Sequence, residues 1–200
     1  AGVGYEAGLR HRLVWSAGTA LETNLTAFRQ DVDNWVQWLP KDGIWTPQNL
    51  RQVRSQGLEA STALRLRQGR YSGGAQLAYH FTDTRKTQGS AADSDPVGVQ
   101  LAFVPLHQAS LSTDHRWRDW LVSSTFVFTS FRYINASGAD FLPGTGLLGA
   151  TLGRTLRGPA RSSLLVLVQA THLLNQAYDS YPGRPAPPRA FSASLRLNWR

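Results

Sequence analysis

The chain has 200 residues, no cysteine, no methionine, a hydrophobic fraction of 42% and a formal net charge of +8. The absence of cysteine excludes a disulfide framework and a thiolate metal site. No run approaches the roughly 18 apolar residues of a helical membrane span, and no signal-peptide core is present. The cations are nearly all arginines that are spread along the chain rather than gathered in one patch, so we expect no nucleic-acid partner.

From the N-terminus onward, the chain shows about nine segments in which apolar and polar residues alternate, separated by turn signals. Alternation of this kind predicts β-strands, and no segment predicts a helix. The expected strands cover 3–12, 14–30, 49–67, 71–84, 108–117, 120–134, 144–157, 162–174 and 189–200.

The alternation separates two chemically different faces. In the segment 49–67, Leu58 and Leu64 share one face, while Glu59, Ala63 and Arg65 share the other. The last strand has one face made of Phe191, Ala193, Leu195, Leu197 and Trp199, opposite Ser192, Ser194, Arg196, Asn198 and Arg200. Such a strand suits a wall with lipid on one side and water on the other. Strands 120–134 and 144–157 alternate less regularly, and their faces stay unassigned.

The connections between the strands are of two kinds. Tight turns that carry arginines fall near Arg12, at 67–70, near 118–119 and at 157–161, whereas long connections that hold many of the acidic residues cover 31–48, 85–107, 135–143 and 175–188. Short turns at one end and long loops at the other are typical of an outer-membrane barrel. The predicted fold class is therefore all-β, an antiparallel meander of about nine long strands that forms part of a transmembrane β-barrel.

Aromatic residues gather where the predicted strands end. The short-turn side has Trp15, Tyr71, Trp117, Trp120 and Trp199; the long-loop side has Trp35, Trp38, Trp45, Phe81, Phe131, Tyr133 and Phe141. Amphipathic rings favour the headgroup level of a membrane, so two girdles are expected. Core aromatics of a soluble all-β domain are the other interpretation of these rings.

The sequence offers no pattern for catalysis, a metal or a cofactor, so we expect no enzyme activity. The five histidines are scattered without the spacing of a metal site. Asp114 and His115 are neighbours in sequence, but adjacent strand residues point to opposite faces and cannot both serve one pocket.

The candidate ligand-binding residues lie in the long loops and on the polar face. Trp35, Trp38 and Trp45 have the rings to stack on a hydrophobic or macrocyclic ligand at the outer end, or to anchor an interfacial girdle. Glu59, Arg65 and His80 are expected to face the lumen, where a substrate path or simply water would lie. Both interpretations stay open for each set.

Several stretches together resemble one family. These are 5–9 with 20–28, the Trp-rich 35–40 with 45–50 and 53–59, the Phe-Val-Pro-Leu-His-Gln stretch 103–108, and the C-terminal 172–200. In this order they resemble the C-terminal barrel portion of TonB-dependent outer-membrane receptors, especially those of the cobalamin and siderophore type. The chain departs from that pattern by placing Arg200 after the terminal aromatic Trp199.

The resemblance implies a receptor in the bacterial outer membrane for TonB-dependent uptake of a scarce nutrient, cobalamin or a ferric siderophore. Its expected partners are outer-membrane lipid, the rest of its own barrel and plug, the nutrient, and a TonB-type energising protein acting through the N-terminal part. We see no TonB box and no plug, so residues 1–200 are expected to be the C-terminal portion of such a barrel. The alternatives are a small self-contained barrel with a structural or adhesive role, and a soluble carbohydrate-binding β-sandwich.

Overall fold

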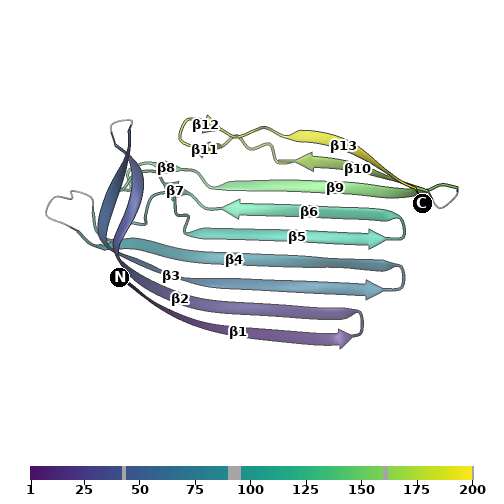
Figure 1. Ribbon diagram of the computed structural model, residues 1–200, viewed down its shortest axis with the longest axis horizontal. Helices are drawn as coiled ribbons and strands as arrows, with labels where there is room; N and C mark the ends of the chain where they lie inside the picture. The colour runs from purple at the N-terminus through teal and green to yellow at the C-terminus, as the bar shows by residue number, and fades with distance from the viewer. Residues whose placement is uncertain (42–43, 90–95, 160–161, 200) are drawn as a thin grey trace.

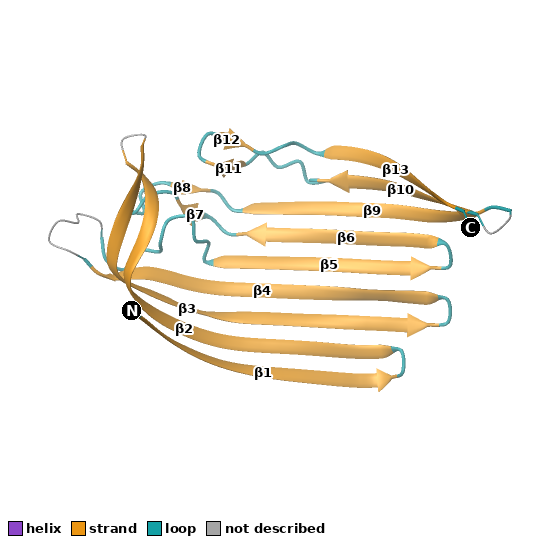
Figure 2. Cartoon of the chain, in the orientation of Figure 1, coloured by secondary structure: helices purple, strands orange, loops and turns teal. Residues whose placement is uncertain are grey.

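The computed structural model describes residues 1–41, 44–89, 96–159 and 162–199, and its main feature is one long antiparallel sheet (Figures 1 and 2). Nine strands follow one another in the order β1-β2-β3-β4-β5-β6-β9-β10-β13. They are β1 (Gly2–Ser16), β2 (Thr19–Lys41), β3 (Ile44–Gln68), β4 (Tyr71–Gln88), β5 (His107–Trp117), β6 (Trp120–Thr129), β9 (Thr145–Arg157), β10 (Ser163–Thr171) and β13 (Ala190–Asn198). The predicted all-β meander of nine strands is confirmed. The described residues include no helix with the length and apolar character to cross a membrane.

The two ends of the sheet are built differently. The turns β1–β2, β3–β4 and β5–β6 each have two residues, and they lie together at the right of Figure 1. The first turn lies at 17–18, so the prediction of a turn near Arg12 was wrong, because Arg12 continues β1 as the partner of Glu22. Gly69 (φ 58°) and Arg118 (φ 55°) supply the left-handed backbone that tight hairpins favour. The long connections lie at the opposite end and carry two small hairpins, β7 (Arg132–Tyr133) with β8 (Phe141–Leu142) and β11 (Asp179–Tyr181) with β12 (Arg184–Pro185).

The prediction that 31–48 forms a loop was wrong for 31–41 and 44–48, and residues 42 and 43 lie outside the described residues. Strands β2 and β3 continue through this region as a paired hairpin, with Trp35 opposite Leu50 and Trp38 opposite Pro47. We call this part, 35–41 with 44–50, the outer hairpin. Asn34 adopts φ 57° just beyond the end of the β1–β2 pairing, and the hairpin turns away from the sheet at this end (Figure 1). The strand preference of Trp, Val and Ile in paired positions outweighed the turn signals of the nearby Asp, Asn and Pro residues.

A small core lies at the end of the sheet that carries the long connections, beside the β2–β3 hairpin. Leu50 and Val53 pack against Leu101, with Val104 beside them. The amide of Gln37 donates a hydrogen bond to the Ala102 carbonyl (2.9 Å), which ties the hairpin to the β4–β5 connection. The rest of the described strands form one wall, whereas a sandwich needs two stacked sheets of comparable size.

The wall has two open edges. Strands β1 and β13 each pair on one side alone among the described residues, and every position of both strands is exposed. An open edge leaves a row of N–H and C=O groups that need partners.

Candidate functional site

The pairing register sorts the wall residues into two faces. One row of partners runs Ala60, Tyr79, Ala109 and Phe128; the adjacent row runs Ser61, Ala78, Ser110 and Val127. We call the face of the first row the outward face and that of the second row the inward face. Predicted apolar positions pair with one another on the outward face, as Leu21 does with Leu64 and Leu58 with Phe81.

The register also assigns faces to the strands whose pattern was irregular. On β6 and β9, Val122 pairs with Leu152 on the outward face, while Val127 pairs with Leu147 on the inward face. Apolar residues therefore occupy both faces of these two strands, which explains why the alternation was weak.

Two Tyr–His pairs frame the outward face of β4 and β5. The Tyr71 hydroxyl lies 2.8 Å from Nδ1 of His115 near the short turns, and the Tyr79 hydroxyl lies 2.8 Å from Nδ1 of His107 near the long connections. The pairs are separated by eight positions, roughly 27 Å along the strands. With the usual tilt of barrel strands this spans about 20 Å of height, most of the roughly 25 Å apolar band of an outer-membrane barrel. Leu77 pairs with Leu111 between them.

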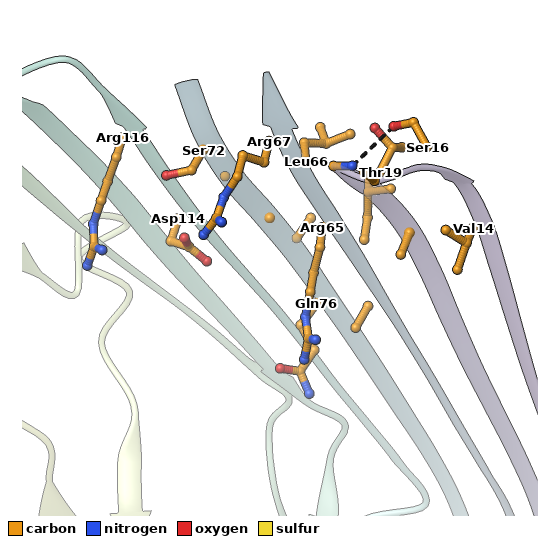
Figure 3. Close-up of a pocket in the computed structure, with 18 of the residues that line it drawn as sticks. Val14, Ser16, Thr19, Arg65, Leu66, Arg67, Ser72, Gln76, Asp114 and Arg116 are labelled. Carbon is orange, nitrogen blue, oxygen red and sulfur yellow. Dashed lines mark hydrogen bonds between the residues drawn. The ribbon is translucent and has the colours of Figure 1, made fainter. Parts of the chain in front are cut away.

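The inward face holds a basic hollow at the short-turn end. Figure 3 shows Arg65, Arg67 and Arg116 projecting to the same side of the wall as Gln76 and Asp114. The hollow has a volume of about 580 Å³. Its side chains carry more positive than negative charge, so it favours anionic groups.

The predicted inward residues occupy two separate levels. Glu59 and His80 are register partners on β3 and β4, with Oε1 3.6 Å from Nδ1 and both side chains about half exposed. Arg65 lies six positions further along β3, in the basic hollow. The structure thus brings Glu59 and His80 together and leaves Arg65 apart.

The three predicted tryptophans do not converge. The register places Trp38 and Trp45 on one face of the outer hairpin and Trp35 on the other. Trp45 instead lies 5.3 Å from Tyr181 and 6.1 Å from Phe103, measured between ring centroids, while Phe103 and Tyr181 stack at 4.9 Å. We call Trp45, Phe103 and Tyr181 the outer ring cluster, since it joins the β2–β3 hairpin, the β4–β5 connection and β11.

Sequence reasoning missed Phe103 and Tyr181 as members of this cluster. Each stands one or two residues before a proline, and Phe103 has a left-handed backbone (φ 63°), but neither feature reveals a ring contact. The Tyr181 hydroxyl is buried without a hydrogen-bond partner among the described residues. Burial raises the pKa of Tyr181, so the phenol stays protonated.

Charged residues occupy the outward face beyond the Tyr79–His107 pair, toward the long connections. Asp31 accepts hydrogen bonds from Arg54 (2.8 Å) and Arg29 (3.0 Å), and Asp83 pairs with Arg85. We call these five residues the charged rim. The hydrogen bond from Arg54 is the main cause that lowers the pKa of Asp31 below its ordinary range, and Arg29 adds to it against the effect of burial. Ion pairs at this level mark where the apolar outward band ends.

The family follows from comparison with known proteins. The family described as TonB dependent receptor-like, beta-barrel, matches residues 2–161. The chain belongs to the TonB-dependent receptor β-barrel family. Members of this family are receptors of the bacterial outer membrane, and in such barrels an apolar face meets lipid while a polar face lines the lumen. We therefore call the outward face of the wall the lipid face and the inward face the lumen face. Within the described residues, no cluster of three His, Asp or Glu side chains is arranged to hold a metal ion.

A solved structure shares the fold of the receptor wall. The crystal structure of BauA, the ferric preacinetobactin receptor from Acinetobacter baumannii, superposes with a TM-score of 0.66 at 18% sequence identity. The match covers 97% of this chain and 29% of BauA, so the chain spans less than a third of that receptor. A search of curated proteins found no match.

Proposed function

We propose that residues 1–200 form the C-terminal portion of an outer-membrane receptor barrel that imports a scarce nutrient with energy from a TonB-type partner. This portion would supply barrel wall and outer connections, while the plug and the N-terminal strands would lie elsewhere in the receptor. The observation that carries the proposal is the open nine-stranded wall, with short turns at one end and long connections at the other, in a chain of this family.

The open edges support a larger barrel. In a bilayer the free N–H and C=O groups of β1 and β13 need strand partners, because lipid supplies none. Closing nine strands on themselves would also leave a much narrower lumen than that of the plugged 22-stranded transporters. The small share of BauA that the chain covers agrees with further strands.

A ferric siderophore suits this wall better than cobalamin. The hollow on the lumen face is lined by Arg12, Arg65, Arg67 and Arg116, with Asp114 as the opposing charge, and such a surface attracts an anionic iron chelate. The outer ring cluster offers an aromatic surface at the end where ligand would arrive. BauA, which shares the fold, is named for a ferric siderophore.

Uptake in cells tests this proposal. Cells that lack other receptors are given the whole receptor, and accumulation of labelled ferric siderophores and of labelled cobalamin is measured with and without a protonophore. We expect proton-motive-force-dependent uptake of a ferric chelate and no uptake of cobalamin. Uptake that persists without the TonB-type partner would refute the proposed energy coupling, and cobalamin uptake would refute the siderophore class.

A variant pair tests the outer ring cluster in the same cells. Trp45→Ala removes the ring that faces Phe103 and Tyr181, and we expect about a 2–10-fold weaker apparent affinity for the ligand. Val36→Ala is the matched control, because Val36 is an exposed residue of the same hairpin without a ring contact. Equal affinities of the two variants for the ligand would show that the outer ring cluster does not contribute to ligand binding.

A further inference from the structure

Two tryptophans and an arginine stand side by side on the lipid face near the short turns. Trp117 of β5 pairs with Trp120 of β6, which in turn pairs with Arg154 of β9. Arg118 lies between the two tryptophans in the β5–β6 turn. Three neighbouring strands thus present two indole rings and two guanidinium groups at one rim of the wall.

Each guanidinium carbon lies over an indole ring, and neither guanidinium makes a hydrogen bond within the described residues. Arg118 lies 5.0 Å from the centroid of Trp117, and Arg154 lies 4.8 Å from that of Trp120. Stacking fixes the plane of a guanidinium while its edge stays available for an oxygen ligand. In the described part of the chain, neither group pairs with a carboxylate, and both side chains are exposed.

The acidic residue of the β5–β6 turn is paired with another arginine. Asp119, the other residue of the β5–β6 turn, accepts two hydrogen bonds from Arg157, one from Nε (3.0 Å) and one from Nη2 (2.8 Å). The Arg157 guanidinium offsets the charge of Asp119, and Asp119 makes no ion pair with Arg118 or Arg154 among the described residues. Their positive charge is open to an anion from outside the protein.

An apolar surface begins next to the two arginines. Val122 and Leu152 pair on the same face, two positions further into the membrane from Trp120 and Arg154, and both are nearly half exposed. A ligand that satisfies both surfaces has a phosphate at one end and a hydrocarbon chain at the other. An inorganic phosphate would leave the Val122–Leu152 surface without a partner.

We infer that this rim binds the phosphate head group of an anionic glycerophospholipid in the periplasmic leaflet, with an acyl chain along Val122 and Leu152. Arg118 and Arg154 donate to the phosphate oxygens, and the stacked indoles hold both guanidinium groups at headgroup height. The inference rests on the proposed function with its usual orientation, in which the long connections lie at the cell exterior and the short turns face the periplasm.

Native mass spectrometry of the whole receptor in detergent measures this binding. The probe is phosphatidylglycerol, titrated against the wild type, Arg118→Gln/Arg154→Gln and a control, Arg12→Gln/Arg116→Gln, which removes the same charge from the lumen face of the same end. We expect the first variant to lose about tenfold or more in affinity and the control to stay within twofold. Equal losses in both variants would overturn the site, because general charge would then explain the binding.

Two further arms identify the ligand and the role of stacking. Glycerol phosphate carries the same charged group without acyl chains, and we expect it to compete poorly; competition as strong as that of the lipid would overturn the lipid assignment. Arg118→Lys/Arg154→Lys keeps the charge but loses the planar fork, and we expect weaker binding than in the wild type. Full binding by this variant would overturn the stacked geometry. Ligand uptake by the Arg118 and Arg154 variants reports separately on the proposed transport, which does not require this lipid.

Discussion

The Tyr71 hydroxyl lies 2.8 Å from Nδ1 of His115 on the lipid face, close to the short turns of the wall. The contact of Tyr79 with His107 repeats this arrangement near the long connections. Between the two levels, Leu64 of β3 pairs with Ala75 of β4, midway between Tyr71 and Tyr79. The two pairs therefore define a membrane level for every neighbouring residue, and Leu64 lies at the centre of the apolar band.

Leu64→Arg is expected to impair assembly far more than Ala63→Arg. An arginine on the lipid face at mid-membrane costs about 2–4 kcal/mol, and much less in an aqueous lumen. Ala63 lies on the lumen face between Glu22 and Gln76, where a cation is tolerated. The measurement is the fraction of folded barrel in outer membranes, scored by heat-modifiable migration. Similar losses for both variants would contradict the assigned faces.

Cysteine labelling is expected to place the short turns in the periplasm. Val97→Cys, in the exposed β4–β5 connection, should react with an impermeant thiol reagent on intact cells. Arg70→Cys, in the β3–β4 turn, should react after the outer membrane is permeabilised. Residues 1–200 contain no cysteine, so each variant adds one thiol to this part of the receptor. The receptor without an added cysteine is the background control. Reaction of Arg70→Cys on intact cells, without reaction of Val97→Cys, would reverse the topology.

The variants Tyr181→Phe and Tyr181→Ala distinguish what the Tyr181 hydroxyl contributes to the stability of the outer ring cluster from what its ring contributes. The hydroxyl is buried without a described partner, so its removal should leave the outer ring cluster as stable or stabilise it by up to about 1 kcal/mol. Loss of the ring removes the contacts with Trp45 and Phe103 and should destabilise the cluster by about 1–2 kcal/mol. Hydrogen exchange of the outer connections measures both effects. A large loss of protection in Tyr181→Phe would show that the hydroxyl has a partner.

Alkaline pH is expected to loosen the same cluster. Because burial raises the pKa of Tyr181 in the folded state, the cluster gains stability that is complete below the ordinary tyrosine pKa of about 10 and is lost as the pH rises through the raised value. Hydrogen exchange of the outer connections, corrected for the intrinsic pH dependence, should therefore show extra opening above that pH in the wild type and none in Tyr181→Phe.

Acid is expected to weaken the charged rim. The pKa of Asp31 is lowered chiefly by the hydrogen bond from Arg54, so its contribution to stability is present above the ordinary aspartate pKa of about 4 and is lost as the pH falls through the lowered value. Asp31→Asn should remove this acid sensitivity in the outer hairpin. Limited proteolysis across pH 2–6 by a protease active in acid gives the comparison, with Asp33→Asn as the control. An unchanged acid transition in Asp31→Asn would assign it to another group.

The isolated 200-residue polypeptide is expected neither to form a stable monomeric barrel nor to transport. Both edge strands leave unpaired backbone groups that lipid cannot satisfy, so the wall should aggregate or persist as an open sheet in detergent. Analytical ultracentrifugation in detergent and uptake by cells with this polypeptide as the sole receptor test the two parts. Concentrative uptake by this polypeptide would favour the small self-contained barrel.

Much of the wall was predictable because a barrel strand has a pattern of apolar and polar residues that can be recognised from the strand's own sequence. Period-two alternation in segments such as 49–67 and 189–200 reports a face of lipid and a face of water within a few residues. The turns at 67–70 and 118–119 were predictable for the same reason, since Gly69 and the Arg-Asp pair stand directly between two alternating runs. The outer hairpin was missed because its Asp, Asn and Pro residues resemble loop residues when their strand partners are unknown.

The sequence by itself determined the strand number, the two kinds of wall end and the faces of the regular strands, because each depends on residues that are close along the chain. The tertiary structure alone decided which distant residues meet. Trp45, Phe103 and Tyr181 join from three separate connections, and Trp117, Trp120 and Arg154 align across three strands. A local pattern cannot report such contacts, because they depend on the pairing register and on the path of the outer connections, which are set by the packing of the whole sheet.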